Sequence, residues 1–166
     1  MRADQLAERY PMTVHEENGK YYERHYVSKV SGRPASGSTM FYVGPEEHTS
    51  FHRIDCDEYW CYHAGSTLEI WIVDPSGALS VKKFGVEDGA DPLVYFPAGV
   101  IFASRHDIPQ EIGADGTLFS CVTVPRFDYR GFELVSREKI TELCPETECF
   151  FWKKMKLYII CSFFTQ

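Results

Sequence analysis

The sequence lacks the features that mark several common classes of protein. No cluster of lysines and arginines forms a basic segment, and the formal net charge is −7, so nucleic-acid binding is not expected. The N-terminal stretch MRADQLAERY has no apolar run behind a basic start and does not look like a secretory signal. No apolar run reaches the roughly 18 residues that a membrane-spanning helix needs. We therefore expect a cytoplasmic protein without a membrane span.

The sequence also has no Cys-x-x-Cys unit. Its six cysteines include the pairs Cys56/Cys61 and Cys144/Cys149, and each pair encloses four residues. This spacing is only a weak match to a zinc site. Without a secretory signal, an even number of cysteines does not imply disulfides. We expect free, partly buried thiols in a reducing compartment.

Short strand-like segments fill most of the chain. They are rich in aromatic and β-branched residues and are separated by glycine and proline, as in the turn Asp74–Gly77. This pattern predicts one all-β domain, either a sandwich, a barrel or a jelly roll. Two short helices flank it, over residues 4–9 and after the N-cap Ser136, and residues 30–37 form a loop. The predicted strands are 21–27, 38–43, 49–54, 58–63, 67–73, 79–84, 93–96, 100–104 and 117–124.

The stretch from Thr49 to Gly65, TSFHRIDCDEYWCYHAG, carries the main functional signal. Alternate side chains of a strand share one face, so Glu58, Trp60 and Tyr62 point the same way, as do His52 and Ile54. If both strands line one barrel, an imidazole, a carboxylate and two aromatic rings surround a single cavity. The stretch therefore predicts a small-molecule pocket.

The same residues resemble the cupin superfamily. Glu58, six further residues and Gly65 fit the end of its first motif, and Pro97-Ala98-Gly99 fits the start of its second. A subfamily of unknown function is more similar still, in blocks that cover most of residues 12–145. These blocks are His15-x-Glu17-x-Gly19-x-Tyr21-x-Glu23, FHRIDCDEYW, AGSTLEI, PAGV and VPRFDYRGFEL.

The resemblance implies an all-β double-stranded β-helix, the cupin jelly-roll barrel, with short flanking helices and the active site inside the barrel. It also implies a homodimer. We assign residues 1–148 to a single cupin domain and residues 149–166 to an apolar C-terminal tail. The tail can be a strand that swaps onto a partner, a segment that lies on a membrane surface, or an extension beyond the domain.

The chain departs from the metal-binding pattern of cupins at two positions. The family pattern has two histidines, a glutamate and a further histidine. Here His52 and Glu58 are present, but Ile54 and Phe102 stand at the other two positions. A stable transition-metal site usually needs three protein ligands, so we expect no metal cofactor.

The remaining pair suggests chemistry without a metal. Histidine titrates near neutral pH, and a nearby carboxylate stabilises its charged form, so His52 and Glu58 are the candidate catalytic pair. Metal-free cupins include sugar-nucleotide epimerases, in which a histidine removes a proton next to a ketone and an acid such as tyrosine returns one. The candidate acids here are Tyr22, Tyr62 and Tyr95. The alternative is that His52 and Glu58 form a satisfied buried pair that only shapes the pocket.

Three functions follow from this sequence. The first is a metal-independent isomerase or epimerase that acts on a sugar-like or nucleotide-sugar-like molecule. The second is a non-catalytic small-molecule-binding protein, and the third, which Ile54 and Phe102 disfavour, is a metal-dependent oxygenase or lyase. Glu69 and Trp71 share a strand face and bind ligand only if that face points inward. The predicted ligand-binding residues are Ser50, Ile54, Trp60, Tyr62, Glu69, Trp71, Phe102, Ser104, Tyr22 and Glu23.

Overall fold

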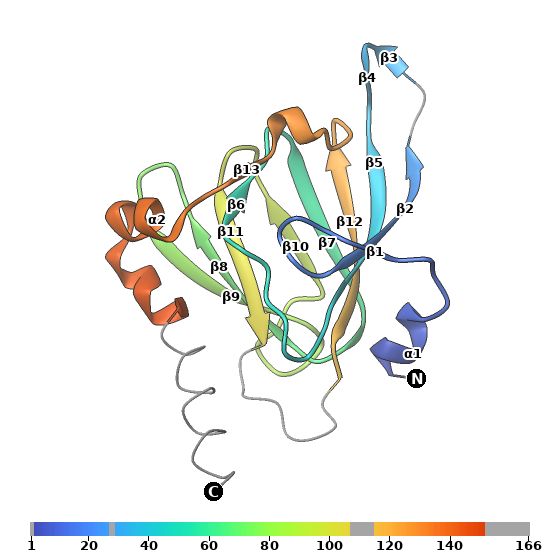
Figure 1. The fold of residues 1–166 in the computed structure, drawn as a ribbon, viewed down its shortest axis with the longest axis horizontal. Coiled ribbons are helices and arrows are strands. Elements are labelled where there is room, and N and C mark those ends of the chain that lie inside the picture. Colours follow the sequence, from blue (N-terminus) through green and yellow to red (C-terminus); the bar gives the residue numbers. More distant parts are fainter. Residues whose placement is uncertain (1, 27–28, 107–114, 152–166) are drawn as a thin grey trace, which may run out of the picture.

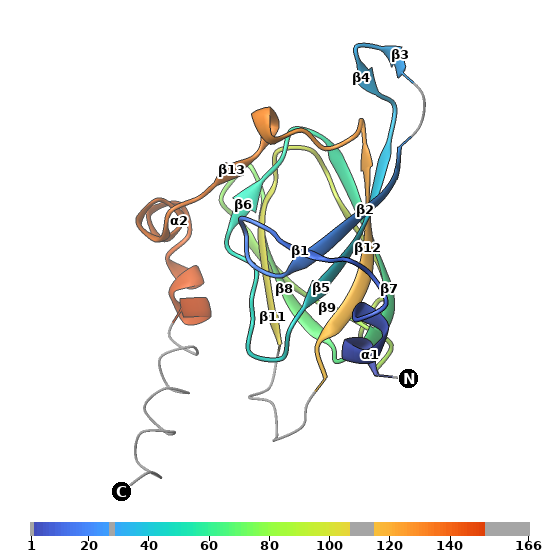
Figure 2. The same ribbon diagram turned by 45° about the vertical axis from the view of Figure 1, so that its right-hand side comes forward.

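The computed structural model describes the backbone of residues 2–26, 29–106 and 115–151, and the side chains of these residues outside 23–31. Two antiparallel sheets face each other and enclose a barrel (Figures 1 and 2). This is the double-stranded β-helix that the sequence predicted.

The larger sheet has six strands in the order β1-β2-β5-β12-β7-β10. The second sheet has five strands in the order β13-β6-β11-β8-β9, and a separate hairpin pairs β3 with β4. The strands are β1 Thr13–Val14, β2 Lys20–Tyr26, β3 Lys29–Ser31, β4 Arg33–Pro34, β5 Gly37–Val43, β6 His52–Arg53, β7 Asp57–Gly65, β8 Leu68–Val73, β9 Leu79–Phe84, β10 Leu93–Phe96, β11 Ile101–His106, β12 Thr117–Val124 and β13 Glu133–Leu134.

Aromatic side chains fill one half of the space between the sheets. Trp60 packs against Phe84, Phe96, Phe102 and Phe119 with ring centroids 4.4–5.8 Å apart. The alternation of β8 sends Leu68, Ile70 and Ile72 into this same core. The dense packing of large rings makes this half of the barrel a rigid wall for the other half.

The opposite face of β8 carries a second apolar layer. Trp71 and Val73 lie there beneath helix α2 (Arg137–Leu143) and Phe150. Helix α2 begins at the predicted N-cap, since the Ser136 hydroxyl accepts a hydrogen bond from the amide of Lys139. Figure 1 shows α2 outside the five-stranded sheet.

Helix α1 (Ala3–Ala7) lies at one end of the barrel, against β7 and β12. The Asp115 carboxylate accepts hydrogen bonds from the amides of Ala3 and Asp4, two donors that have no partner inside the helix. The buried side of α1 packs on Tyr42 and Leu118.

Two sequence predictions differ locally from the structure. The predicted strand 49–54 is reduced to β6, His52–Arg53. Before it, the amide of Thr49 still donates to Ser104 of β11, but the amide of Ser50 donates to Glu17 of the β1–β2 turn. The predicted loop 30–37 contains the short β3–β4 hairpin.

The five cysteines that the structure describes are free thiols. Within the described ranges, no helix is long and apolar enough to cross a bilayer. Most of the predicted tail, residues 152–166, lies outside the described residues.

Gly65, at the end of β7, provides a test of the fold. It has a φ of +106°, and a Cβ there would lie 1.8 Å from the carbonyl oxygen of Gly116. We expect Gly65→Ala to lower the melting temperature by more than Gly89→Ala. Gly89 has a φ of +80° with no heavy atom within 4 Å, so its substitution costs only about 1–2 kcal/mol of backbone strain. Equal losses in thermal unfolding would contradict a steric role for Gly65.

Candidate functional site

A cavity of about 290 Å³ lies inside the barrel, next to the aromatic core. Both sheets contribute to it, together with the turn between β1 and β2 and the segment 126–132, which we call the strap. The lining residues are His15, Glu17, Tyr21, Gly37, Thr39, Phe41, His52, Ile54, Glu58, Cys121, Thr123, Arg126, Phe127, Asp128, Tyr129 and Phe132.

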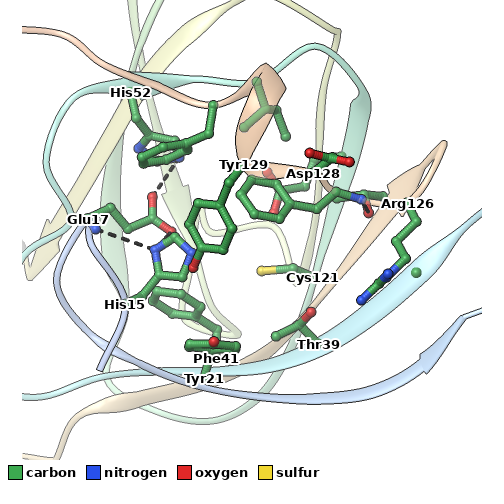
Figure 3. A pocket seen from close by; sticks show the side chains of 16 residues that line it. His15, Glu17, Tyr21, Thr39, Phe41, His52, Cys121, Arg126, Asp128 and Tyr129 are labelled. Atoms are coloured by element: carbon green, nitrogen blue, oxygen red, sulfur yellow. Dashed lines mark hydrogen bonds and ion pairs between the residues drawn. The ribbon is translucent and has the colours of Figure 1, made fainter. Parts of the chain in front are cut away.

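The Glu17 carboxylate lies between two imidazoles in this cavity (Figure 3). Its Oε2 is 2.6 Å from Nε2 of His52, and its Oε1 is 3.2 Å from Nδ1 of His15. Glu17 and His52 are 8% and 3% exposed. A buried carboxylate is costly unless it is paired, and the two rings provide that pairing.

A tight turn brings His15 and Glu17 into the barrel. The amide of His15 donates to the carbonyl of Gly19 at 3.0 Å, and Asn18 and Gly19 have φ values of 71° and 84°. Asparagine and glycine are the residues that adopt this left-handed conformation most readily. The amide of Ser50 then donates to the carbonyl of Glu17 at 2.8 Å, which fixes the turn beside β6.

Both ring nitrogens of His52 are engaged. Nδ1 lies 2.8 Å from the carbonyl oxygen of Ser50, which only accepts, so the network places a proton on Nδ1. Nε2 faces Glu17. Burial lowers the pKa of His52, but the charge and hydrogen bond of Glu17 and the Ser50 carbonyl raise it by more, so the net pKa is raised.

Glu58 projects from β7 into the same cavity and is 7% exposed. Burial, followed by the negative charge of Glu17, raises the pKa of Glu58 to about 7. The indole Nε1 of Trp60 donates to Oε1 of Glu58 at 3.0 Å, and the Cys121 thiol is a further hydrogen-bond partner. Glu58 therefore exchanges a proton close to neutral pH.

The ring of His15 lies among aromatic side chains. Tyr129 stacks on it at a centroid distance of 5.7 Å, and Tyr21, Phe41 and Phe132 approach it edge-on at 5.3–5.7 Å. Burial lowers the pKa of His15, so its neutral form predominates at pH 7. Burial and a hydrogen bond with Tyr21 raise the pKa of Tyr129 to about 12, so this phenol stays protonated.

A hydrogen bond from Arg33 attaches the strap over the cavity. Arg33 donates to the carbonyl of Arg126, and its guanidinium pairs with the Asp55 carboxylate through two hydrogen bonds at 3.0 and 3.1 Å. Asp128 caps the 3-10 turn η1 (Tyr129–Gly131) by accepting from the amide of Arg130. The strap thus presents Phe127, Tyr129 and Phe132 to the cavity.

This barrel, with a polar cavity at one end, agrees with the comparison against protein families. A family model described as "Cupin superfamily (DUF985)" matches residues 4–135. The chain belongs to this cupin family. A search of curated proteins found no match.

Solved structures of similar proteins give the same result. A protein from Shewanella oneidensis is 27% identical, with a TM-score of 0.80 over 90% of this chain and 94% of that chain. A hypothetical protein from Leishmania major is 29% identical, with a TM-score of 0.78 over 89% of this chain and 95% of that chain. Oxalate decarboxylase from Bacillus subtilis is 18% identical, with a TM-score of 0.56 over 78% of this chain and 33% of that chain, which shows a shared fold alone.

The donor atoms of this cupin do not fit the family's metal site. Ile54 reaches the cavity with a side chain that has no donor atom, and the Phe102 ring lies 4.3 Å from the His52 ring and 4.2 Å from the Phe96 ring, measured between centroids. Among the residues that the structure describes, no three histidine, cysteine, aspartate or glutamate side chains are grouped to hold a metal ion.

Three of the residues proposed from the sequence line the cavity, namely His52, Ile54 and Glu58. The structure brings the proposed catalytic pair into one cavity, but the polar partner of His52 is Glu17. Sequence reasoning had paired it with Glu58.

Five other proposed residues support the cavity or lie deeper in the barrel. Trp60 and Phe102 are core residues that contact Glu58 and His52 respectively. Ser50 holds Nδ1 of His52 through its carbonyl. Tyr62 donates to the carbonyl of Gly65, and Ser104 hydrogen bonds with Thr49.

The last four proposed residues include two on the outer face of β8. Glu69 pairs with Arg105 at 2.9 Å, and the guanidinium of Arg105 lies 4.9 Å from the ring centroid of Trp71, in the layer beneath Phe150. Tyr22 stacks on Tyr10 outside the cavity lining. The side chain of Glu23 lies outside the described residues.

Sequence reasoning did not propose His15, Glu17, Tyr21 and Tyr129 as site residues. The first three were visible as a family-like block, His15-x-Glu17-x-Gly19-x-Tyr21, and Tyr129 stood in the block VPRFDYRGFEL. Neither Tyr22, Tyr62 nor Tyr95 lines the cavity, whereas Tyr21 and Tyr129 do. The signal was therefore present in the motif, but the pattern alone did not show that the turn enters the barrel.

The raised pKa of Glu58 predicts how stability depends on pH. Because the pKa rises from 4.5 to about 7 on folding, the stabilisation is complete below pH 4.5 and is lost as the pH rises through 7. At 1.36 kcal/mol per pH unit, this loss is about 3 kcal/mol. We expect Glu58→Gln to gain about this much stability relative to wild type between pH 4.5 and 8.

Urea unfolding at each pH measures this difference. The exposed residue Glu87 provides the control, and Glu87→Gln is expected to keep a constant difference from wild type across the same range. A difference for Glu58→Gln that does not change with pH would contradict a raised pKa of Glu58.

Proposed function

We propose that this cupin binds a small polar carbonyl compound inside the barrel and isomerises it by proton transfer without a metal. The observation that supports this most strongly is the arrangement of His15, Glu17 and His52 around a cavity that also holds the proton-exchanging Glu58. The residues of this set differ in charge state, as an acid-base reaction requires.

His15 is the proposed base. The Glu17 amide donates a long hydrogen bond to Nδ1 at 3.4 Å, which belongs to the tautomer with its proton on Nε2. The proposed reaction uses the other tautomer, in which Nδ1–H faces the nearer Oε1 of Glu17 at 3.2 Å and Nε2 carries the lone pair. Within the described residues Nε2 has no polar partner, and the low pKa of the ring keeps it unprotonated at pH 7.

His52 is the proposed positioning residue. Because Ser50 and Glu17 occupy both of its nitrogens, it offers none to a ligand. The charge and hydrogen bond of Glu17 raise the pKa of His52, which favours its protonated form. Glu17, paired with His52 at 2.6 Å, in turn orients the ring of His15.

Glu58 is the proposed acid. With its pKa raised to about 7, the Glu58 carboxyl group is protonated in about half of the protein molecules at pH 7. In the proposed reaction, Nε2 of His15 takes a proton from the carbon next to the ligand carbonyl, while Glu58 gives its proton to the carbonyl oxygen. The resulting enediol collapses when His15 gives its proton to the former carbonyl carbon and Glu58 takes a proton from the neighbouring hydroxyl, which becomes the new carbonyl. The two carbons exchange oxidation states with no external oxidant.

A non-catalytic binding function remains the second candidate. The observation that favours it is the complete pairing of His52, since a satisfied buried ion pair also shifts pKa values without taking part in catalysis. The same cavity serves both functions. Proton exchange at the ligand carbon separates them.

Deuterium exchange tests the catalytic proposal. In D₂O, we expect the protein to place deuterium on the carbon next to the carbonyl of a hydroxy-ketone such as dihydroxyacetone or fructose. Proton NMR measures the rate as the loss of that carbon's C–H signal. His15→Ala and Glu58→Gln are expected to lower the rate by about 10²–10⁴-fold, the usual contribution of a general acid or base.

His63 offers a matched control. It is exposed and hydrogen bonds to Ser120, outside the cavity lining, so His63→Ala is expected to exchange at the wild-type rate. Thermal unfolding of each variant shows that the barrel is intact. Exchange that is unchanged in folded His15→Ala would remove His15 as the base.

A further inference from the structure

The cavity limits the size of its ligand. Its volume of about 290 Å³ corresponds to about ten water molecules at the density of the liquid. A monosaccharide fits this space. A nucleotide-linked sugar has several times as many non-hydrogen atoms, so the part beyond its sugar would have to lie outside this cavity.

The walls combine flat apolar faces with hydrogen-bonding groups. Phe41, Phe127 and Phe132 contribute rings, and Thr39 and Glu58 contribute a hydroxyl and a carboxyl group. In Figure 3, Thr39 and Cys121 lie across the cavity from the cluster of His15, Glu17 and His52. Rings that cover apolar C–H faces, with polar groups between them, suit a compact polyhydroxy compound.

The charges of the cavity oppose an anionic ligand. Glu17 and Glu58 both face it, and the negative charge of Glu17 already makes ionisation of Glu58 harder. Nε2 of His52 is already occupied by Glu17 at 2.6 Å, so the ring has no charge to spare for a ligand anion. A phosphate or carboxylate group would add a further negative charge close to both carboxylates, in surroundings that screen it poorly.

The strap contributes one cation to the lining, away from the histidines. In Figure 3 Arg126 lies on the side of the cavity opposite Glu17, with its side-chain stem against Gly37, and it has interactions of its own. Asp128, which also lines the cavity, is paired with Arg130 at 2.6 Å.

We propose that the ligand is an uncharged hydroxy-carbonyl compound of monosaccharide size, bound without a phosphate, carboxylate or nucleotide group. The carbonyl group in this assignment rests on the proposed function. The size of the ligand, its fit between aromatic rings and its lack of charge are inferred from the cavity itself and do not depend on any reaction.

Matched pairs of sugars test the assignment. We would measure binding to the wild-type protein by saturation-transfer NMR and calorimetry, using fructose against fructose 6-phosphate, glucose against glucuronate, and uridine diphosphate as a nucleotide probe. The free sugars are expected to bind at least tenfold more tightly than their charged counterparts. Uridine diphosphate is expected not to compete with them.

Charge-removing variants identify the cause of the selectivity. Glu17→Gln/Glu58→Gln is expected to bring the binding ratio of fructose to fructose 6-phosphate closer to one, because the repelling carboxylates are gone. Glu58→Gln alone, which leaves Glu17 and His52 paired, provides a milder variant if the double variant fails to fold. Glu87→Gln is expected to leave the ratio at the wild-type value.

Each outcome decides between the two proposals. Tighter binding of fructose 6-phosphate, glucuronate or uridine diphosphate, or the absence of binding by any free sugar, would overturn the ligand assignment. Selective binding of free sugars without deuterium exchange would uphold this assignment and overturn the proposed isomerisation. Exchange on charged compounds alone would overturn the assignment and uphold the isomerisation.

Discussion

The site depends on one buried carboxylate, that of Glu17, and on how its charge is compensated. Two imidazoles face its two oxygens, and its backbone carbonyl accepts from Ser50. An uncompensated charge at this depth would cost several kcal/mol, so the arrangement is tightly coupled. The same contacts hold the β1–β2 turn inside the barrel and orient the rings of His15 and His52. The pKa of Glu58 is raised first by burial and then by the charge of Glu17.

The barrel is divided into two halves with different chemistry. One half is closed by packed rings around Trp60 and Phe102, and the other holds the titratable cluster. The two halves meet at defined contacts, since the Trp60 indole donates to Glu58 and the Phe102 ring lies against His52. Rigid packing on one side therefore positions the groups that exchange protons on the other.

The apolar residues at two cupin histidine positions and the cluster of His15, Glu17, His52 and Glu58 occur at the same cavity. At the positions of two cupin histidines, Ile54 and Phe102 contribute only apolar surface. The remaining histidine, His52, is neutralised by a carboxylate of the N-terminal turn. The result is a cavity in which His15, Glu17, His52 and Glu58 lie together without a metal-binding group of the cupin pattern among the described residues, and the proposed proton transfer and the proposed neutral ligand both rest on this arrangement.

The sequence by itself determined an all-β domain, because alternating strands separated by glycine and proline turns depend on local geometry. That pattern left a sandwich, a barrel and a jelly roll open, and the resemblance to cupins selected the jelly roll. The sequence also placed His52, Ile54 and Glu58 toward the inside, and by the same resemblance Ile54 and Phe102 stand where cupins have metal-binding histidines. The two faces of β8 were correctly separated by alternation, but only the tertiary structure showed that Glu69 and Trp71 face outward, beneath Phe150. Only the tertiary structure could bring His15 and Glu17 to His52, because they are far apart in the chain and meet through a turn that enters the barrel. Alternation fixes the side of a strand on which a residue lies, whereas the partner of a buried charge is fixed by how the sheets and turns close around it.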